Sequence, residues 1–211
     1  MRSRRPLARG AAAVTDAPEP GMRYQDLARF RVPAGFRGKS ALVVQLWWIV
    51  QALLFRPSPQ VCFGWRRFLL RLFGARIGRD VLIRASAEFT YPWKVSIGDF
   101  SWIGDGAILY SLGEISIGAH SVISQYCYLC AGSHDPRAVG FDIVAKPISV
   151  GSECWLATDV FVAPGISIGD AAIVGARSTV LHDLPPAMIC HGYPARPVRP
   201  RVLPQDAGSG S

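Results

Sequence analysis

The side chain best suited to proton transfer in this sequence is His134, within the stretch Ala131-Gly-Ser-His-Asp-Pro136. Histidine has an unperturbed pKa of about 6.5, so near neutral pH its imidazole can serve as a general base. A surface-loop histidine without a chemical role is the alternative interpretation. His134 stands at the start of a long interruption in a repeat, described below, and this position favours the catalytic hypothesis.

A zinc site must also be considered, because Cys127 and Cys130 form a Cys-x-x-Cys pair and His134 follows four residues later. Both cysteines occupy places where the repeat requires a small residue, and the sequence contains no second Cys-x-x-Cys. The other histidines lack the spacing of paired ligands: His120, His182 and His191. We therefore expect no metal.

A six-residue repeat dominates the second half of the chain. Its aliphatic positions recur without a break: Val150, Leu156, Val162, Ile168, Val174 and Val180. The residue that follows is Gly or Ala in all but the last case. A period of six fits neither a helix nor an alternating strand, but it fits a triangular β-solenoid with one short strand and one corner per hexad.

The same pattern extends upstream, where Ile77, Ile97 and Ile117, each followed by Gly, lie twenty residues apart. Counting hexads gives about five coils, a prism roughly 24 Å tall at about 4.8 Å per stacked strand. The long interruption runs from Asp135 to Ser149. A long loop in an otherwise strict solenoid is usually functional.

Two helices are expected before the solenoid. The apolar run Ala41–Phe55 ends at Arg56-Pro-Ser-Pro59, and a second helix over about Val61–Phe73 ends at Gly74. The sequence thus divides into a disordered basic arm (1–21), a helical extension (22–76), the solenoid (77–200) and a flexible tail (201–211).

Charge is distributed unevenly: residues 1–84 carry 16 basic and 4 acidic side chains (net +12), whereas residues 85–211 carry 7 and 11 (net −4). The five cysteines show no pattern of a secreted disulfide scaffold, which favours a reducing compartment. Residues 1–20 lack the apolar core of a signal peptide. We expect a cytoplasmic protein that does not bind nucleic acid.

The run Ala41–Phe55 has fifteen residues, too few to span a bilayer. Arginines surround it, and no acid follows before Asp80. Residues 37–84 could therefore hold the protein at the inner face of the cytoplasmic membrane, because cations near an anionic surface favour binding. A helix that caps the open end of the solenoid is the other hypothesis.

The sequence also resembles a known family. The hexads, together with Lys146-Pro-Ile-Ser-Val-Gly151, Pro164-Gly-Ile-Ser-Ile-Gly169 and Gly192-Tyr-Pro-Ala-Arg196, look like the left-handed β-helix, hexapeptide-repeat acetyltransferases. More narrowly, Leu70-Arg-Leu-Phe-Gly74, Thr90-Tyr-Pro-Trp93 and Ser133-His-Asp135 resemble the colanic-acid-type exopolysaccharide O-acetyltransferases. The left-handed sense of the helix is implied by this resemblance alone.

The resemblance implies a homotrimer with active sites between subunits, acetyl-CoA as co-substrate with no permanently bound cofactor, and a sugar hydroxyl as acceptor, which could be lipid-linked. His134 would then remove the hydroxyl proton, and a backbone N–H near Thr158 would stabilise the oxyanion. Trp155 would shape the donor tunnel, and Ala176 would contact the pantetheine arm. The cations expected at the CoA phosphates are Arg196 and Arg199.

Several positions depart from the family. Leu181-His182 replaces a Thr-Lys pair, so His182 is the remaining candidate for that CoA contact. Gly104 replaces an acceptor-binding Asn, with Asp105 beside it. The expected acceptor side also includes Asp135, Tyr91 and Trp93.

The partner that orients the His134 imidazole stays open between Asp135, Asp142 and a backbone carbonyl. A non-catalytic β-helix scaffold and a β-helix metalloenzyme of the carbonic-anhydrase type are the alternatives to an O-acetyltransferase.

Overall fold

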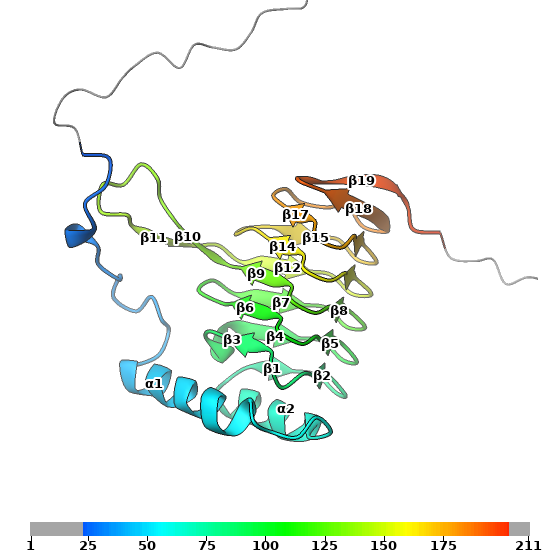
Figure 1. The fold of residues 1–211 in the computed structure, drawn as a ribbon, viewed down its shortest axis with the longest axis horizontal. Helices are drawn as coiled ribbons and strands as arrows, with labels where there is room; N and C mark the ends of the chain where they lie inside the picture. Colours follow the sequence, from blue (N-terminus) through cyan, green and yellow to red (C-terminus); the bar gives the residue numbers. More distant parts are fainter. Residues whose placement is uncertain (1–22, 203–211) are drawn as a thin grey trace, which may run out of the picture.

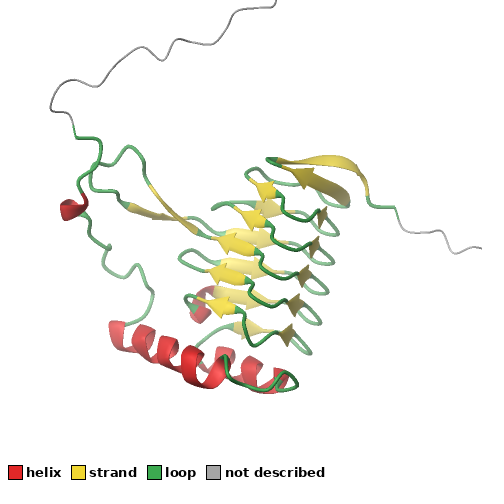
Figure 2. Ribbon diagram, viewed as in Figure 1, coloured by secondary structure: helices red, strands yellow, loops and turns green. Residues whose placement is uncertain are grey.

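The computed structural model describes residues 23–202, and the predicted arm (1–21) and nearly all of the predicted tail lie outside them. The chain winds into a parallel β-solenoid with three flat faces, and a layer of helices closes one end (Figures 1 and 2). Five complete coils are followed by the start of a sixth, in which Leu184 bridges to Ile168 and β18 pairs with β16. The predicted solenoid of about five coils is confirmed.

Each face is one parallel sheet. Sheet A comprises β1 (Arg76–Ile77), β4 (Val95–Ile97), β7 (Ile115–Ile117), β12 (Ile148–Val150) and β15 (Ser167–Ile168). Sheet B comprises β2 (Leu82–Ile83), β5 (Trp102–Ile103), β8 (Val122–Ile123), β13 (Trp155–Leu156), β16 (Ile173–Val174), β18 (Met188–Gly192) and the antiparallel β19 (Ala195–Pro200). Sheet C comprises β3 (Glu88–Phe89), β6 (Ile108–Tyr110), β9 (Tyr128–Cys130), β14 (Phe161–Val162) and β17 (Thr179–Val180).

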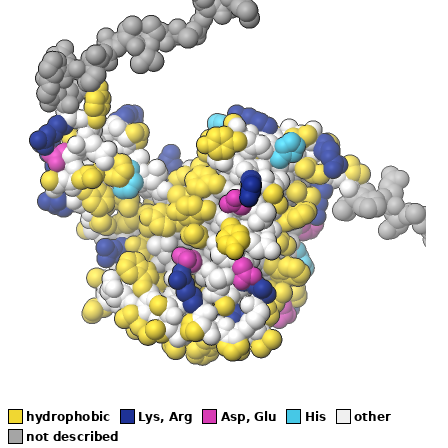
Figure 3. Space-filling model, viewed as in Figure 1, with side chains coloured by type: hydrophobic (Ala, Val, Ile, Leu, Met, Phe, Trp, Pro, Cys, Tyr) yellow, Lys and Arg dark blue, Asp and Glu magenta, His cyan; other side chains and the backbone are white. Residues whose placement is uncertain are grey.

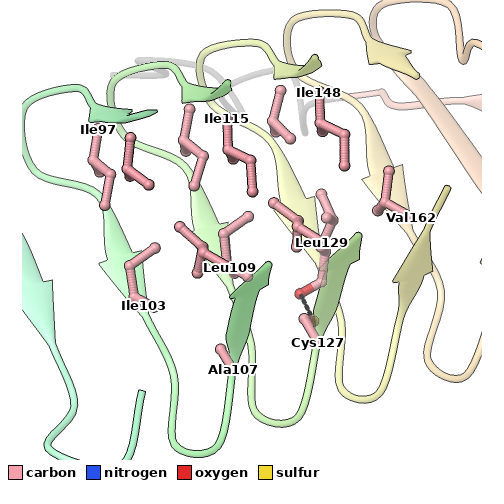
Figure 4. Close-up of a cluster of buried hydrophobic side chains, with 14 of the residues drawn as sticks. Ile97, Ile103, Ala107, Leu109, Ile115, Cys127, Leu129, Ile148 and Val162 are labelled. Carbon is pink, nitrogen blue, oxygen red and sulfur yellow. Dashed lines mark hydrogen bonds between the residues drawn. The ribbon is translucent and has the colours of Figure 1, made fainter. Parts of the chain in front are cut away.

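The aliphatic residue of each hexad points into the prism, where successive coils stack like on like (Figure 4). Ile97 pairs with Ile117 on sheet A, and Leu109 pairs with Leu129 on sheet C. All four side chains are buried. Burying an aliphatic side chain of this size stabilises the fold by about 1.5–3 kcal/mol, which is why the period-six pattern specifies the solenoid.

The small residue after each aliphatic is required by close packing between coils. A Cβ built on Gly118 would lie 2.5 Å from the Ser152 nitrogen, and one on Gly98 would lie 2.5 Å from the Ala119 nitrogen. Cys127 fills another small position, where its thiol donates to the Ala157 carbonyl at 3.1 Å. The repeat therefore accounts for this cysteine without a metal.

The helical layer consists of α1 (Ala41–Val50), the π-helical turn η2 (Gln51–Phe55) and α2 (Phe63–Leu72). The helical run from Ala41 ends at Phe55, as the sequence predicts, although its last turn is η2 and not part of α1. Helix α2 begins two residues later than expected, because the chain still turns through a bond from the Cys62 N–H to the Pro59 carbonyl. Trp47, Phe55 and Leu70 are fully buried against the first coil. None of the helices in residues 23–202 has the length and apolarity to cross a membrane.

Arginines of α2 fasten this layer to the solenoid. Arg66 is fully buried and donates to the carbonyls of Ile83, Pro59 and Gln60. Arg71 donates to the Ile77 and Gly78 carbonyls. A buried guanidinium whose N–H groups donate to these carbonyls is a structural clamp, so Arg66 and Arg71 are directed to the first coil and not outward.

The predicted loop 135–149 is instead part of a two-stranded hairpin that leaves the prism between coils three and four. Its strands are β10 (Gly132–His134) and β11 (Ile143–Ala145), paired antiparallel with His134 opposite Ile143. In Figure 1 the hairpin projects from the solenoid toward η1 (Leu27–Arg29). A bond from the Asp26 N–H to the Val139 carbonyl joins the two segments.

Candidate active site

The imidazole of His134 is held by Phe141, on the other arm of the hairpin. His134 Nδ1 lies 2.7 Å from the Phe141 carbonyl oxygen, and the two rings stack with centroids 3.7 Å apart and planes at 12°. A carbonyl oxygen can only accept, so Nδ1 carries the hydrogen in the neutral ring. Nε2 therefore presents its lone pair, as a general base requires.

Of the three orienting partners that the sequence left open, the backbone carbonyl is the one observed. The Asp135 carboxylate accepts instead from the Arg137 backbone N–H at 2.9 Å, and this bond holds the pKa of that carboxyl below its ordinary value. Asp142 offers its backbone carbonyl to the Asp135 N–H at 2.9 Å. Neither carboxylate bonds to the imidazole, so of the three candidates the backbone carbonyl alone contacts the ring in residues 23–202.

A cavity of about 500 Å³ opens beside this histidine. Its walls combine the hairpin with Lys146 and Pro164, and Arg137 lies at its margin. The cavity follows the edge where sheet C meets sheet A, since the hairpin leaves after β9 and rejoins the solenoid at β12. We call this edge the C–A edge.

The expected donor-binding residues gather on a different edge, where sheet B meets sheet C. Thr158 and Ala176 are exposed at this B–C edge on successive coils, joined by a bond from the Arg177 N–H to the Thr158 carbonyl at 2.9 Å. The N–H of Thr158 donates to no acceptor within residues 23–202. An unpaired N–H at an exposed residue is what an oxyanion donor requires.

Trp155 and Asp105 belong to the same region. The Trp155 indole lies on the outer side of sheet B, about half exposed, and donates to the Ser124 hydroxyl at 3.1 Å. Asp105 lies at the B–C edge two coils below Thr158 and accepts from Arg84 at 2.6 Å and from Ser86 at 2.8 Å. Partial burial raises the pKa of Asp105, but these hydrogen bonds outweigh it, and the net pKa lies below the ordinary value.

A second cavity, of about 380 Å³, lies on the outer side of sheet B over Trp102 and Asp105. Phe63 of the helical layer closes one end, and Arg84 and Gln125 supply polar atoms. Trp102 is exposed over 53% of its surface. Sequence reasoning missed this indole, although its place outside sheet B, one residue before the buried Ile103, follows from the hexad.

The remaining predicted residues are more scattered. Arg196 and Arg199 are exposed on β19, at the end of sheet B, opposite His191 and Ile189 respectively. His182 is exposed at the C–A edge, after β17, and is therefore separated from Ala176 by the width of sheet C.

Tyr91 and Trp93 do not line either cavity. Tyr91 is buried and stacks on Trp93, with ring centroids 5.2 Å apart. The Trp93 indole donates to the Arg37 carbonyl at 2.6 Å. Lys94 also donates to the Phe36 carbonyl at 2.8 Å. The rings of Tyr91 and Trp93, together with Lys94, hold the segment before α1 against the solenoid.

No group of three or more His, Cys, Asp or Glu side chains that could hold a metal occurs in residues 23–202. The five cysteines are all unpaired thiols within this range.

Comparison with solved structures identifies the fold as that of the hexapeptide-repeat acetyltransferases, a left-handed parallel β-helix. The chain superimposes on such an acetyltransferase from Vibrio cholerae, complexed with acetyl coenzyme A, with a TM-score of 0.70 at 24% identity over 78% of this chain and 92% of that one. A galactoside acetyltransferase in complex with coenzyme A gives a TM-score of 0.70 at 23% identity, over 81% and 84%. No protein-family model matches the sequence.

The sequence itself is 61% identical to the colanic acid biosynthesis acetyltransferase WcaF of Escherichia coli K12, over 178 residues that cover 84% of this chain and 98% of that protein. The chain therefore belongs to this family of acetyltransferases, and the resemblance stated from the motifs is confirmed. Membership of this family favours an enzyme over the non-catalytic scaffold and the metalloenzyme.

Proposed function

We propose that the protein transfers the acetyl group of acetyl-CoA to a sugar hydroxyl during assembly of an exopolysaccharide related to colanic acid. The observation that carries this proposal is the orientation of His134, whose Nδ1 bonds to the Phe141 carbonyl and whose Nε2 is left as a base. The relative at 61% identity is named for colanic acid biosynthesis, and a solved relative holds acetyl-CoA.

In the proposed reaction, Nε2 of His134 takes the proton of the acceptor hydroxyl while the oxygen attacks the thioester carbonyl carbon. A tetrahedral oxyanion forms, and the Thr158 N–H would stabilise it. The C–S bond then breaks, the acetyl ester remains on the sugar, and the CoA thiolate takes the proton from the imidazolium. Every proton and electron pair is accounted for without a metal.

The donor would lie along the B–C edge of one chain. There the exposed Ala176 and the Trp155 indole offer a wall for the pantetheine arm, and Arg196 and Arg199 offer cations for the phosphates. His182 would contribute from the C–A edge of a neighbouring chain. The acceptor would meet the Trp102 and Asp105 cavity, because an exposed indole beside a carboxylate and a guanidinium suits a sugar ring.

We propose a homotrimer, as the resemblance to the family implies, and the outer faces of the three sheets support this proposal. Sheet A exposes a ladder of small hydroxyls, among them Ser96, Ser116 and Ser149. Sheet B instead aligns apolar side chains outward: Leu82, Trp102, Val122, Trp155, Ile173 and Ile189. Sheet C aligns Ile108, Tyr128 and Phe161, with Glu88 and Thr179 at the two ends of the same column.

Two apolar faces and one polar face suit a closed ring, in which sheet C of one copy meets sheet B of the next. The two faces differ, so the contact is heterologous, and the number of three copies is what the resemblance to the family implies. We propose that in this ring the His134 hairpin, which projects beyond the prism, reaches the donor residues of a neighbouring chain.

The first experiment measures transfer of labelled acetyl from acetyl-CoA to saccharide precursors. His134→Ala should lower turnover by about 10²–10⁴-fold while leaving the fold and the CoA affinity nearly unchanged. His120→Ala is the matched control, because His120 also stacks on a phenylalanine, Phe100, but lines neither cavity. Near-normal transfer by His134→Ala would refute the assignment.

The second experiment tests whether two chains share one site. His134→Ala and Ala176→Trp should each be inactive alone, the latter because an indole would obstruct the donor. Refolding the two variants together should restore activity, since a mixed ring contains a site with both native residues. A site within one chain predicts no recovery, and light scattering that reports an active monomer of about the 22.9 kDa chain mass would exclude the ring.

We also propose that the acceptor is lipid-linked and that residues 37–84 bring the enzyme to the inner face of the membrane. The exposed side of the helical layer supports this proposal.

A further inference from the structure

The helical layer has two apolar sides. Towards the solenoid it buries Val44, Trp47 and Phe55, and on α2 Leu69 and Leu70. Its opposite side also carries large apolar side chains, all exposed: Leu42, Leu46, Ile49, Leu53, Trp65, Phe68 and Leu72. We call this set the outer face. Capping the solenoid explains the buried side only.

The outer face is continuous across the two helices. Leu42, Leu46, Ile49 and Leu53 follow helical spacing along α1 and η2, and Leu42 and Leu53 are 83% and 67% exposed. The Trp65 indole joins the helices by donating to the Leu54 carbonyl at 3.0 Å. It stacks on Phe68 with centroids 5.7 Å apart. Figure 3 shows hydrophobic side chains along the lower edge of the molecule, where the layer lies.

An apolar surface of this extent marks a binding site, and the charge around it indicates the occupant. The sequence contains no acidic residue from Leu27 to Arg79. Lys39 precedes α1 and Arg76 follows α2, and neither has an acidic partner among residues 23–202. An apolar face with such cations before its first helix and after its second matches an anionic lipid surface.

Other occupants fit less well. A second copy docked by the same face would bring cation against cation, because a two-fold contact pairs a surface with itself. Residues 1–22 carry four arginines and few large apolar side chains, so they do not complement the face.

We propose that the outer face inserts into the headgroup region of an anionic bilayer and holds the solenoid upright on it. The coils stack away from the helical layer (Figure 1). His134 leaves the third coil, two coil spacings or about 10 Å above the first. With about 10 Å for the thickness of a helix, the base stands roughly 20 Å from the bilayer. If the proposed ring forms, three outer faces share one plane and bind together.

The inference deepens the proposed function, since it states how a lipid-linked acceptor is met, but its test needs no acetyl transfer. The full chain is mixed with vesicles of equal parts phosphatidylcholine and phosphatidylglycerol and then floated. The wild type should float, and Leu46→Glu/Ile49→Glu should reduce the bound fraction by about tenfold or more. Both positions are exposed, so the variant should unfold at the wild-type temperature.

Leu27→Glu/Val202→Glu is the matched control, because it adds the same two charges at exposed sites outside the layer. It should float like the wild type. If the glutamates prevent folding, Leu46→Ser/Ile49→Ser replaces them. Failure of the wild type to float, or equal flotation of wild type and outer-face variant, overturns the inference. The inference is also overturned if the outer-face variant has half the particle mass of the wild type, since a second copy would then cover the face in the wild type.

The upright orientation has its own measurement. Brominated lipids quench tryptophan at short range, so Trp65→Phe should remove much of the quenching and Trp155→Phe very little. Equal losses from both variants would contradict the orientation. Transfer to a water-soluble sugar should be unchanged by Leu46→Glu/Ile49→Glu. Loss of flotation with normal transfer would therefore bear only on membrane binding by the outer face. Flotation without any transfer would bear only on the proposed acetyl-transfer activity.

Discussion

Phe141 is the residue on which the orientation of the proposed base depends, and Phe141→Ala tests that role. The backbone carbonyl that accepts from Nδ1 is kept in this variant, while the ring that stacks on the imidazole at 3.7 Å is lost. Phe141 also has a φ of 55°, a left-handed conformation that is uncommon for a bulky residue. Alanine shares that backbone preference, so the substitution isolates the contribution of the ring.

The expected size of the effect on kcat follows from the energy of the stack between the Phe141 ring and the His134 imidazole. An aromatic pair of this kind contributes about 0.5–1.5 kcal/mol beyond burial. If that energy confines the imidazole to one rotamer, its loss lowers the population of the reactive orientation by roughly 2- to 12-fold, since about 1.4 kcal/mol corresponds to tenfold. We expect kcat to fall by that factor and KM for acetyl-CoA to stay unchanged, because the ring does not lie on the B–C edge.

The matched control is Phe100→Ala. Phe100 also has a left-handed backbone, with φ 58°, and stacks on a histidine, His120, with centroids 5.1 Å apart and planes at 19°. It should lose stability to a similar degree and keep its kcat. Nitrogen NMR supplies the second readout: the His134 ring should be a single Nδ1–H tautomer in the wild type and a mixture in Phe141→Ala. Unchanged kcat and tautomer in that variant, or an equal loss in Phe100→Ala, would refute the positioning role.

Three further predictions concern stability and reactivity. Leu129→Ala, in the fully buried core, should lower the free energy of unfolding by about 2–5 kcal/mol in a denaturant titration. Asp105 has a pKa below its ordinary value, because the bonds from Arg84 and Ser86 outweigh the effect of burial. The stabilisation that the ionised carboxylate contributes is therefore present above about pH 4 and is lost as the pH falls through the lowered pKa. Asp105→Asn should make the free energy of unfolding less dependent on pH in this acid range. Burial raises the pKa of Cys127 to about 11, so mass spectrometry should find this thiol unalkylated at pH 8 in the folded protein, whereas the partly exposed Cys62 reacts.

Much of the fold could be predicted from the sequence because the hexad repeats one physical requirement many times. An aliphatic residue must fill the prism, and the next residue must clear the neighbouring coil, as at Gly118. Each coil imposes the same two requirements, so a single exception does not obscure the pattern. The hairpin is not part of this repeat. Its pairing of Gly132 with Ala145 occurs once, and nothing in the period-six register predicts it.

Individual contacts of the candidate site are harder to predict than its candidate residues. His134 stands out by its chemistry and by its place before the interruption. Its orienting group is a backbone carbonyl, which every residue possesses, so no residue type in the sequence marks it. Nearby Asp135 was the more conspicuous candidate, but its carboxylate closes a turn onto the Arg137 N–H. In the same way, the arginines of α2 indicated a charged surface, whereas Arg66 and Arg71 bind carbonyls of the first coil.

The placement of the proposed site residues on two different edges nevertheless follows from their positions in the sequence. Residues one coil apart stack, so Ala176, eighteen residues after Thr158, lies directly above it, and Thr158 lies above Gln125, whose carbonyl accepts from the Thr158 hydroxyl. His134 is out of phase with this column, since it follows β9 and not β8. A base proposed on one edge and donor contacts proposed on another cannot meet across the intervening sheet of the same prism. The repeat therefore supports the proposal that a neighbouring copy completes the site.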